Sequence, residues 1–393
     1  MFINELPDEC LLIIFGSINE LDDLVSCYKV CSKWSHLIAE RTRKVKYLFE
    51  HYECWNGETS PNYALDHVYY CKQEQIDATC LSTFFPNLII ADFSGFLAKV
   101  KYETIVTLAK RMKSLKGVSN HYHYDRYESI FQYCDGLQMV SNYDIEPWIR
   151  ENGANIKQLH LYSSKLDRFK EDAHCFPNLE RLHIFNTEGS PDGPYDGPVL
   201  GRLKIVELEL PSDTTRRIYY GFQFMDSCPN LQSAHISLQS CRLFVDESLT
   251  HKSLQDLVIT FYNSVYDGIF DWDELKRLFM KYPNLKHLAL CDNRKLRDWH
   301  IERLVRILPN LVLFAVRGCP RVTQAAANYV QDYNKLYGRS IKFYFKDNYH
   351  EIQSDWPQLS TRGEKISQGF DFMKHCFLKD FDNLSAFLIT SDN

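Results

Sequence analysis

A Pro-Asn-Leu phrase recurs along most of this chain, and each copy precedes a short run in which apolar and polar residues alternate. The five clear copies lie at 86–88, 177–179, 229–231, 283–285 and 309–311. Weaker copies without the Pro-Asn begin at Leu115, Leu137, Ile156, Leu203, Leu254 and Ile341. Most of these anchors are about 19 to 31 residues apart, a period that indicates a stack of similar structural units.

The alternating run after each anchor predicts a short strand. In the copy Leu285-x-x-Leu288-x-Leu290, the leucines face one side of the strand and the intervening residues face the other. Amphipathic segments such as 272–279 and 301–308 precede the phrase and are predicted to be helices that end at Pro283 and Pro309. One helix and one strand cannot bury their apolar side alone, so the copies must stack.

This pattern resembles the helix-rich class of leucine-rich repeats. The residues Cys291-Asp292 and Gly318-Cys319 resemble the end of a repeat in that class. The resemblance implies an α/β fold in which a curved solenoid has a parallel sheet on its inner wall and helices outside. Strand-like residues at 45–49 are expected to cover the open edge of the first repeat, because an uncovered edge invites aggregation.

The first forty residues differ from the repeats and predict three short amphipathic helices. Pro7 suits a first helical position, and Asn19 can cap a second helix. A third helix carries Val30 and Trp34. The apolar residues of this segment exceed what so short a bundle can bury, and a surplus apolar face indicates a protein partner. The alternative is an ordinary helical bundle with all of these residues in its core.

The order and spacing of these residues resemble the F-box, the module that joins a substrate receptor to a Skp–cullin–F-box ubiquitin ligase. The matching residues are Leu6-Pro7, Ile14-Phe15, Leu21-x-x-Leu24 and Val30-Cys31-x-x-Trp34. Leucine-rich repeats follow the F-box in many members of that family. The resemblance implies that six residues either contact a Skp-type adaptor or hold the helices that do: Leu6, Pro7, Ile14, Leu24, Val30 and Trp34.

We therefore expect three regions. Residues 1–45 are expected to be an F-box, residues 46–345 a solenoid of about ten to eleven irregular repeats, and residues 346–393 a C-terminal cap or tail. In the tail, a helical pattern runs from Ile366 to Phe377, and a strand-like run extends from Leu384 to Ile389. The Gly- and Pro-rich stretch between Asn186 and Gly201 is expected to be a loop.

Composition narrows the class of partner and the compartment. The 393 residues carry a formal net charge of −6 without any dense run of Lys and Arg, which argues against nucleic acid as the main partner. The 13 cysteines are scattered without Cys-x-x-Cys pairs, and no stretch has the length of a membrane span or the form of a secretory signal. We expect reduced thiols, no membrane association, and a cytoplasmic or nuclear location.

Motifs for catalysis are not found. The sequence contains no phosphate-binding Gly-Lys loop, dinucleotide glycine pattern, Gly-x-Ser-x-Gly elbow or His-Glu-x-x-His helix. The acidic cluster at 271–274 is better explained as a helix start than as a metal site. His121 and His123 are expected to be solvated loop residues. We therefore expect no catalytic residue, no metal and no cofactor, and a protein that acts by positioning its target.

The outward positions of the strands are expected to form two columns across the inner wall. The central column contains Ser119, Ser141, His160, His183, Glu207, His235, Val258, Ala289 and Ala315, and the next contains His121, Tyr143, Tyr162, Phe185, Glu209, Ser237, Thr260, Cys291 and Arg317. Exposed aromatic residues on a rigid concave face are typical of binding hot spots. The predicted substrate-binding residues are Tyr143, His160, Tyr162, His183, Phe185 and His235. The alternative is that aromatic residues occur there because they favour strands.

The predicted function is that of a substrate-recognition subunit of a Skp–cullin–F-box ubiquitin ligase, active in ubiquitin-dependent protein degradation. Its expected partners are a Skp-type adaptor, a cullin held through that adaptor, and an unidentified target protein. The alternative is a non-catalytic interaction scaffold that binds a Skp-type adaptor without directing ubiquitination. A third possibility is an enzyme with a site in the tail, but no residue of the sequence supports it.

Overall fold

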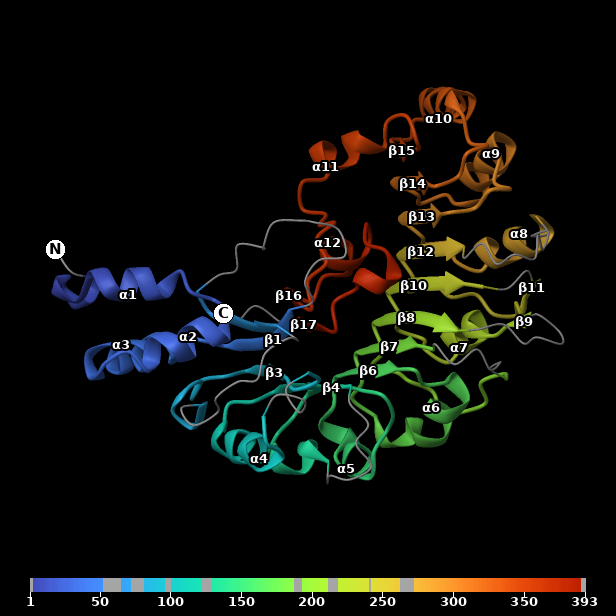
Figure 1. Ribbon diagram of the computed structural model, residues 1–393. Coiled ribbons are helices and arrows are strands. Elements are labelled where there is room, and N and C mark those ends of the chain that lie inside the picture. The colour runs from blue at the N-terminus through green and yellow to red at the C-terminus, as the bar shows by residue number, and fades with distance from the viewer. Residues whose placement is uncertain are drawn as a thin grey trace. The chain divides into compact units, whose positions relative to one another are not determined.

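The computed structural model (Figure 1) describes residues 3–51, 65–71, 81–95, 100–121, 129–186, 193–210, 218–239, 242–261 and 272–389. The chain forms two compact units, residues 1–156 and 157–393. The division between the units falls inside the range 46–345 that we expect to be the solenoid. The domain boundaries at residues 45 and 345 therefore stay predictions.

The first unit begins with three helices that pack against one another, as predicted. They follow a 3-10 turn, and their bounds are η1 (Ile3–Glu5), α1 (Asp8–Gly16), α2 (Leu21–Tyr28) and α3 (Ser32–Thr42). Leu11, Leu24 and Ile38 are fully buried, and Phe15 is 1% exposed. Acidic residues open α1 and α2, where the helix dipole favours negative charge.

A parallel sheet follows the helices in the first unit, in the strand order β2-β1-β3-β4-β5. The strands are β1 (Tyr47–His51), β2 (His67–Cys71), β3 (Ile90–Asp92), β4 (Gly117–Asn120) and β5 (Met139–Asn142). Helix α4 (Tyr102–Arg111) lies between β3 and β4 in sequence, and α5 (Pro147–Glu151) follows β5. The predicted strand at 45–49 exists as β1, and it pairs with β3, the strand of the first repeat, so it covers the edge of that repeat as predicted. It lies between β2 and β3, so β2 is the outer strand.

The helical region attaches directly to the outer strand β2. The backbone N–H of Tyr69 donates to the carbonyl of Asn19 at 2.9 Å, and Glu20 forms a parallel bridge with Tyr69. The buried Arg41 of α3 also donates to the Asn19 side chain at 3.0 Å. Backbone pairing of this kind covers a sheet edge that would otherwise be open to other chains. It also fixes the three helices to the sheet.

In the described residues of the second unit, the main sheet has eight parallel strands in the order β6-β7-β8-β10-β12-β13-β14-β15. The strands are β6 (Gln158–Tyr162), β7 (Arg181–Phe185), β8 (Ile205–Leu210), β10 (Ser233–Leu238), β12 (Asp256–Phe261), β13 (His287–Cys291), β14 (Leu313–Arg317) and β15 (Lys342–Tyr344). A separate two-stranded sheet joins β9 (Ile218–Tyr219) to β11 (Arg242–Leu243). The helices are α6 (Leu166–Asp172), α7 (Gly221–Asp226), α8 (Trp272–Met280), α9 (Asp298–Ile307) and α10 (Gln324–Tyr337).

The predicted α/β repeat architecture is confirmed. Each of the eleven anchors is followed by a strand of a parallel sheet. Figure 1 shows α6, α7, α8 and α9 on one side of the strands of the second unit. The predicted helices at 272–279 and 301–308 correspond to α8 and α9, although α9 begins earlier, at Asp298. Leucines such as Leu182 and Leu288 face the helices and are fully buried.

The structure explains why asparagine recurs in the phrase. Its side-chain amide donates to a backbone carbonyl of an earlier segment, and these bonds are Asn87 to Arg43 (2.8 Å), Asn230 to Gly201 (2.6 Å), Asn284 to Lys252 (2.8 Å) and Asn310 to Pro283 (3.0 Å). A carbonyl at the turn between repeats would otherwise lack an intramolecular donor. Asparagine thus ties each of these turns to the segment before it.

The predicted columns are also confirmed within each unit. In the second unit His160 lies beside His183, then Glu207, then His235, and the neighbouring column runs from Tyr162 through Phe185 to Glu209. In the first unit Ser119 lies beside Ser141. The period of two along each strand fixed this alignment, because a shift by one residue would turn the leucines away from the helices.

The C-terminal segment lies on the other face of the sheet in the second unit. Its elements are α11 (Ile352–Asp355), β16 (Ile366–Gln368), α12 (Phe372–Cys376), η8 (Phe381–Asn383) and β17 (Phe387–Ile389), and β16 pairs with β17. Figure 1 shows it in red, on the side of the strands opposite α6 to α9. The predicted helix from Ile366 to Phe377 is only partly right, because Ile366 belongs to a strand.

Candidate functional site

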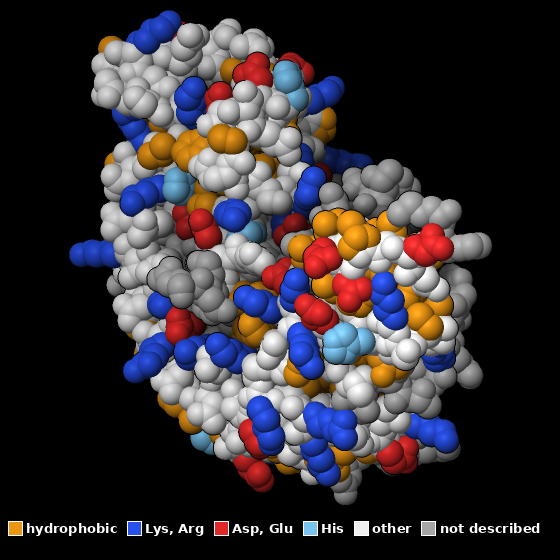
Figure 2. Space-filling model, turned by 90° about the vertical axis from the view of Figure 1, so that its left-hand side faces the viewer, with side chains coloured by type: hydrophobic (Ala, Val, Ile, Leu, Met, Phe, Trp, Pro, Cys, Tyr) orange, Lys and Arg blue, Asp and Glu red, His pale blue; other side chains and the backbone are white. Residues whose placement is uncertain are grey.

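The three-helix region has exposed apolar side chains on α1, in the turn η1 before it and in the turn between α2 and α3. Ile13 is 76% exposed, Val30 55%, Ile3 48% and Ile14 39%. Pro7 is exposed beside them in sequence, at the start of α1. Figure 2 looks at the side of the molecule that carries these helices and shows hydrophobic side chains there among acidic and basic ones. Apolar side chains left in water in this way are available to a partner.

Side chains of α3 hold the N-terminal residues in place. The indole N–H of Trp34 donates to the Asn4 side chain at 2.7 Å, and its ring packs edge-on against Phe15, with 5.0 Å between ring centroids. Lys33 Nζ donates to the carbonyl of Leu6 at 3.1 Å. The residues before α1 are therefore held in place in the free protein, which lowers the entropy cost of binding.

The six predicted adaptor-binding residues fall into two groups. Pro7, Ile14 and Val30 are exposed, and Leu6 and Trp34 are half-buried. Leu24 is fully buried between the helices, so it holds the bundle together and does not reach the surface. The sequence argument missed Ile3 and Ile13. The unbroken apolar run at 11–15 could have indicated Ile13, because a helix that is apolar on all sides needs a partner to cover the side that its own bundle leaves exposed.

Comparison with known proteins decides the nature of this region. Residues 3–43 match the F-box-like family model. These residues form an F-box-like domain. The exposed apolar surface therefore belongs to the F-box-like domain, which is followed in this chain by leucine-rich-repeat-like units.

Two solved structures are similar to the chain at low identity. One is the crystal structure of the Rad7 and Elc1 complex in yeast, with a TM-score of 0.39 and 13% identity over 81% of this chain and 90% of that one. The other is a leucine-rich-repeat protein of Leptospira interrogans, with a TM-score of 0.28 and 13% identity over 86% of this chain and 98% of that one. No curated protein sequence matches the chain.

The second candidate surface is the inner face of the second unit, where the sequence analysis placed the target. The C-terminal segment covers much of it. The ring of Phe381 packs against His183, His235 and Phe185 with centroid separations of 5.0, 5.5 and 6.0 Å. Apolar side chains of α12 and β17 join Val258, Ala289 and Ala315 in one buried core.

Two buried polar side chains hold the backbone of this segment. Gln158 donates to the carbonyl of Leu388 at 2.6 Å and accepts from its N–H at 3.0 Å. Arg181, only 1% exposed, donates to the carbonyls of Ser385 at 2.6 Å and Ala386 at 3.1 Å. These bonds reach the peptide groups themselves, so they fix the path of the chain beside β6 and β7.

Arg181 is neutralised by Glu207, which is fully buried. The two side chains are 2.6 Å apart, and Glu207 also lies 3.0 Å from His183 and accepts the Cys376 thiol at 3.2 Å. Burial alone would raise the pKa of Glu207, but Arg181, His183 and Cys376 outweigh it and lower that pKa to about 2. Burial lowers the pKa of His235 to about 4. This part of the inner face therefore carries an ionised Arg–Glu pair and neutral histidines near pH 7.

Acidic residues of the segment meet charged side chains of the strands further along the columns. Asp380 forms an ion pair with Arg317. Burial raises the pKa of Glu209 to about 7, and the nearby Asp382 carboxylate adds to the effect. Gln239 donates to Glu209 at 3.2 Å. One contact of the segment is thus attractive and another becomes repulsive when Glu209 ionises.

The six predicted substrate-binding residues are less accessible than the sequence analysis assumed. His235 is fully buried, His183 is 4% exposed and His160 is 9% exposed. Their expected exposure is wrong, because the C-terminal segment packs over this part of the columns. Tyr162 and Phe185 are half-buried, as is Tyr143 in the first unit. Whether any of the six binds a target stays a prediction.

The structure also places the other residues that the sequence singled out. His121 lies with its Nε2 atom 2.6 Å from the Ser141 hydroxyl. His123, Asp271 and residues 187–192 of the expected loop lie outside the described residues, and Trp272 begins α8 as expected. In the described part of the chain, no group of three or more His, Cys, Asp or Glu residues is arranged to hold a metal ion. None of the described helices has the length and apolar character needed to cross a bilayer.

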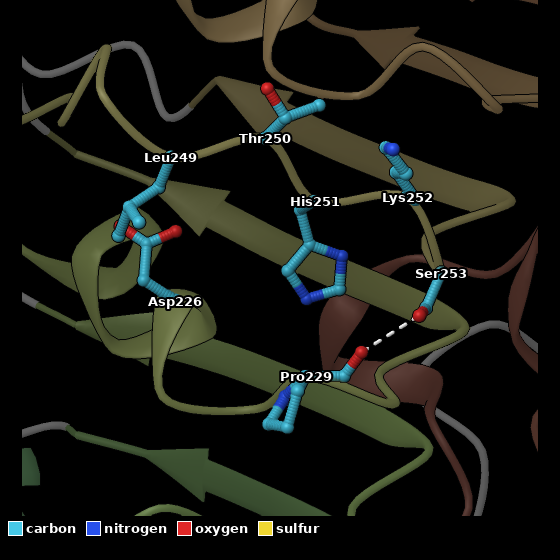
Figure 3. A pocket seen from close by; sticks show the side chains of 7 residues that line it. All are labelled: Asp226, Pro229, Leu249, Thr250, His251, Lys252 and Ser253. Carbon is cyan, nitrogen blue, oxygen red and sulfur yellow. Dashed lines mark hydrogen bonds between the residues drawn. The ribbon is translucent and has the colours of Figure 1, made fainter.

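A pocket of about 270 Å³ lies at the end of α7 in the second unit (Figure 3). Asp226, Leu249 and His251 line it. Asp226 binds the buried Lys281 at 2.6 Å, and His251 donates to the carbonyl of Cys228 at 2.8 Å. One polar atom of each of these two side chains is therefore used in a bond within the fold.

Proposed function

We propose that this protein is the substrate-recognition subunit of a Skp–cullin–F-box ubiquitin ligase. The observation that carries the proposal is the exposed apolar surface of the F-box-like domain at Ile13, Ile14 and Val30, with Pro7 beside it. A Skp-type adaptor would cover these side chains and would connect the protein to a cullin.

The attachment of the domain supports a positioning role. Backbone bonds join the segment before α2 to strand β2, so the F-box-like domain is fixed to the first repeats of its own unit. A rigid connection between an adaptor-binding surface and these repeats holds a target that is bound to them at a set place. Holding reactants together contributes to the rate without a catalytic side chain in this subunit.

We further propose that the target contacts the inner face beside the C-terminal segment. Tyr162 and Phe185 are the half-buried aromatic residues there, with 5.0 Å between their ring centroids. Tyr143 remains a candidate on the first unit. His160, His183 and His235 would take part only after the segment leaves the face, because it covers His183 and His235 and lies over β6.

The proposal is tested in cells by comparing two double variants. Ile14→Asp/Val30→Asp changes exposed residues of the F-box-like domain, and Val312→Asp/Val199→Asp changes residues of similar exposure in the second unit. With the proteasome inhibited, the wild type and the control should capture the adaptor, a cullin and ubiquitinated proteins. The domain variant should lose all three.

The outcomes separate the candidate functions. The scaffold is favoured if the wild type captures the adaptor and a cullin but no protein changes its ubiquitination or lifetime when the wild type is removed. Equal capture of the adaptor by wild type and domain variant would refute the assignment of the surface. Adding Tyr162→Ala/Phe185→Ala to the wild type tests the target contact, which should fall while adaptor capture is unchanged.

A further inference from the structure

The outer helices α8, α9 and α10 carry aromatic and arginine side chains in a row, which we name the aromatic–arginine ridge. These helices are neighbours in the second unit (Figure 1). The ridge consists of Trp272, Trp299, Arg303, Arg306, Tyr329, Tyr333, Leu336 and Tyr337. Neither the F-box-like domain nor the inner face uses any of them.

Side chains of α8 and α9 form one end of the ridge. The guanidinium of Arg303 lies over the ring of Trp299 at 4.7 Å and over that of Trp272 at 5.6 Å, and the two indoles meet edge to face at 5.5 Å. Trp299 remains 38% exposed and Arg303 is exposed. Tryptophan and arginine are the residue types that most often dominate the energy of protein interfaces.

Tyrosines along α10 continue the ridge. Tyr329, Tyr333 and Tyr337 follow one another at helical spacing, with centroid separations of 6.1 and 4.5 Å. Arg306 of α9 donates to the Tyr329 hydroxyl at 2.7 Å. Tyr337 is 62% exposed and Leu336 beside it is 75% exposed. The rings are already ordered by one another, so binding would cost little side-chain entropy.

The part of the chain that contains α9 and α10 has a positive net charge, whereas the whole chain has a negative one. Residues 294–342 contain ten Lys and Arg but three Asp and Glu, whereas the whole chain has a net charge of −6. Among the three acids, Asp298 is engaged by Thr323. Four of the ten bases are also engaged: Arg339 binds carbonyls at the end of α9, and Arg317, Lys335 and Lys342 form ion pairs with Asp380, Asp332 and Asp355. Arg303 and Arg306 are exposed within the ridge itself. An acidic surface would complement them.

We propose that the aromatic–arginine ridge is a docking surface for an acidic segment of another protein that also carries aromatic or aliphatic side chains. A second copy of the chain fits less well, because a two-fold contact would bring the same positive surfaces together. Single-stranded nucleic acid also stacks on aromatic residues, but the negative net charge of the chain opposes it. This inference goes beyond adaptor and target binding at the other two surfaces.

The test uses the purified full chain and short fluorescein-labelled peptides in which charge and aromatic content vary independently. The peptides are acidic, neutral or basic, each with or without two phenylalanines. Anisotropy should show the tightest binding for the acidic, phenylalanine-containing peptide. Arg303→Glu/Arg306→Glu should weaken that complex by at least about tenfold and should create a preference for the basic peptide.

Two further variants keep the test independent of folding. Leu336→Asp changes a highly exposed side chain and should also weaken acidic-peptide binding, while Val199→Asp, at an exposed position elsewhere in the second unit, should not. Circular dichroism checks that each variant is folded. Binding that ignores peptide charge, survives the arginine reversal, or is matched by single-stranded poly(U) would overturn the proposal. Self-association abolished by Leu336→Asp would overturn it in favour of a second copy.

Discussion

Arg181 and Glu207 form a buried ion pair, with 2.6 Å between guanidinium and carboxylate and at most 1% of either side chain exposed. The same guanidinium donates to the carbonyls of Ser385 and Ala386. One side chain therefore links the strands of the second unit to its C-terminal segment. Because the charge of Arg181 is satisfied within the sheet, its remaining donors are available to hold the segment.

Replacing Arg181 with Met should destabilise the protein and loosen the C-terminal segment. Removing one partner of a buried ion pair costs about 3–5 kcal/mol, because the other charge remains in an apolar surrounding. The free energy of unfolding from urea denaturation should fall by that amount. Amide hydrogen exchange should become faster at 387–389, the residues of β17.

Lys281 provides the control, since it forms a buried ion pair with Asp226 away from the segment. Lys281→Met should cost a similar free energy without a selective change in exchange at β17. Arg181→Met/Glu207→Leu should recover part of the lost stability but leave β17 loosened, because the carbonyls of residues 385 and 386 still lack their donor. Unchanged protection of β17 in Arg181→Met would contradict this role for Arg181.

Glu209 should make stability depend on pH. Burial, followed by the Asp382 carboxylate, raises its pKa from 4.5 to about 7, so the folded state holds a proton that the unfolded state releases between these values. The contribution of Glu209 to stability therefore falls as the pH rises from about 4.5 to about 7. Glu209→Gln should remove this decrease. The difference in unfolding free energy between wild type and variant, measured at about pH 5 and about pH 8, isolates the effect.

Other groups of the inner face titrate in the same range, which is why the difference is needed. Burial lowers the pKa values of His183 and His235, so their contributions to stability rise with pH below about 6.5. These contributions are present in wild type and variant alike. An identical pH dependence in wild type and Glu209→Gln would mean that Glu209 titrates normally.

Gly318 should be the least replaceable of three glycines in the second unit. It follows β14 with φ of +63°, and a Cβ atom there would collide with the Asp292 side chain. Gly318→Ala should lower the melting temperature through a loss of about 1–3 kcal/mol. Gly338 has the same φ, but an added Cβ atom would meet open space. Gly338→Ala should lower the free energy of unfolding by only about 1 kcal/mol.

Gly201 completes this comparison, because it has neither a positive φ nor any atom within 4 Å of an added Cβ. Gly201→Ala should change the stability by less than about 0.5 kcal/mol. The order Gly318, Gly338, Gly201 is therefore expected in thermal denaturation. Equal losses at Gly318 and Gly338 would show that the contact with Asp292 is unimportant.

Local patterns in the sequence were sufficient to predict the repeats and their alignment. The leucines after each anchor recur with a period of two, and burying them fixes which residues share a column, such as His183 and Glu207. The F-box-like domain was equally visible, since its helices are set by residues close together in sequence. In these cases the stabilising contacts repeat or are short in range.

The covering of the inner face could not be predicted in this way. Arg181 and Ser385 are 204 residues apart, and no repeated sequence pattern links the two positions. The sequence around a histidine on the outward side of a strand does not show whether the side chain contacts solvent or the ring of Phe381. The strand at 387–389 could be predicted from the sequence of the tail. The surface on which it packs could not, because that surface forms only when the second unit folds.

Binding of a Skp-type adaptor to the purified chain tests the central claim most directly, with Ile13→Asp and Leu336→Asp as a matched pair. Both residues lie on helices, and they are 76% and 75% exposed. Calorimetry should show a one-to-one complex with the wild type and with Leu336→Asp. Ile13→Asp should weaken the complex roughly thirtyfold, or by about 2 kcal/mol, because a charge would enter an apolar contact. No complex with the wild type, or equal affinities for all three proteins, would contradict the account.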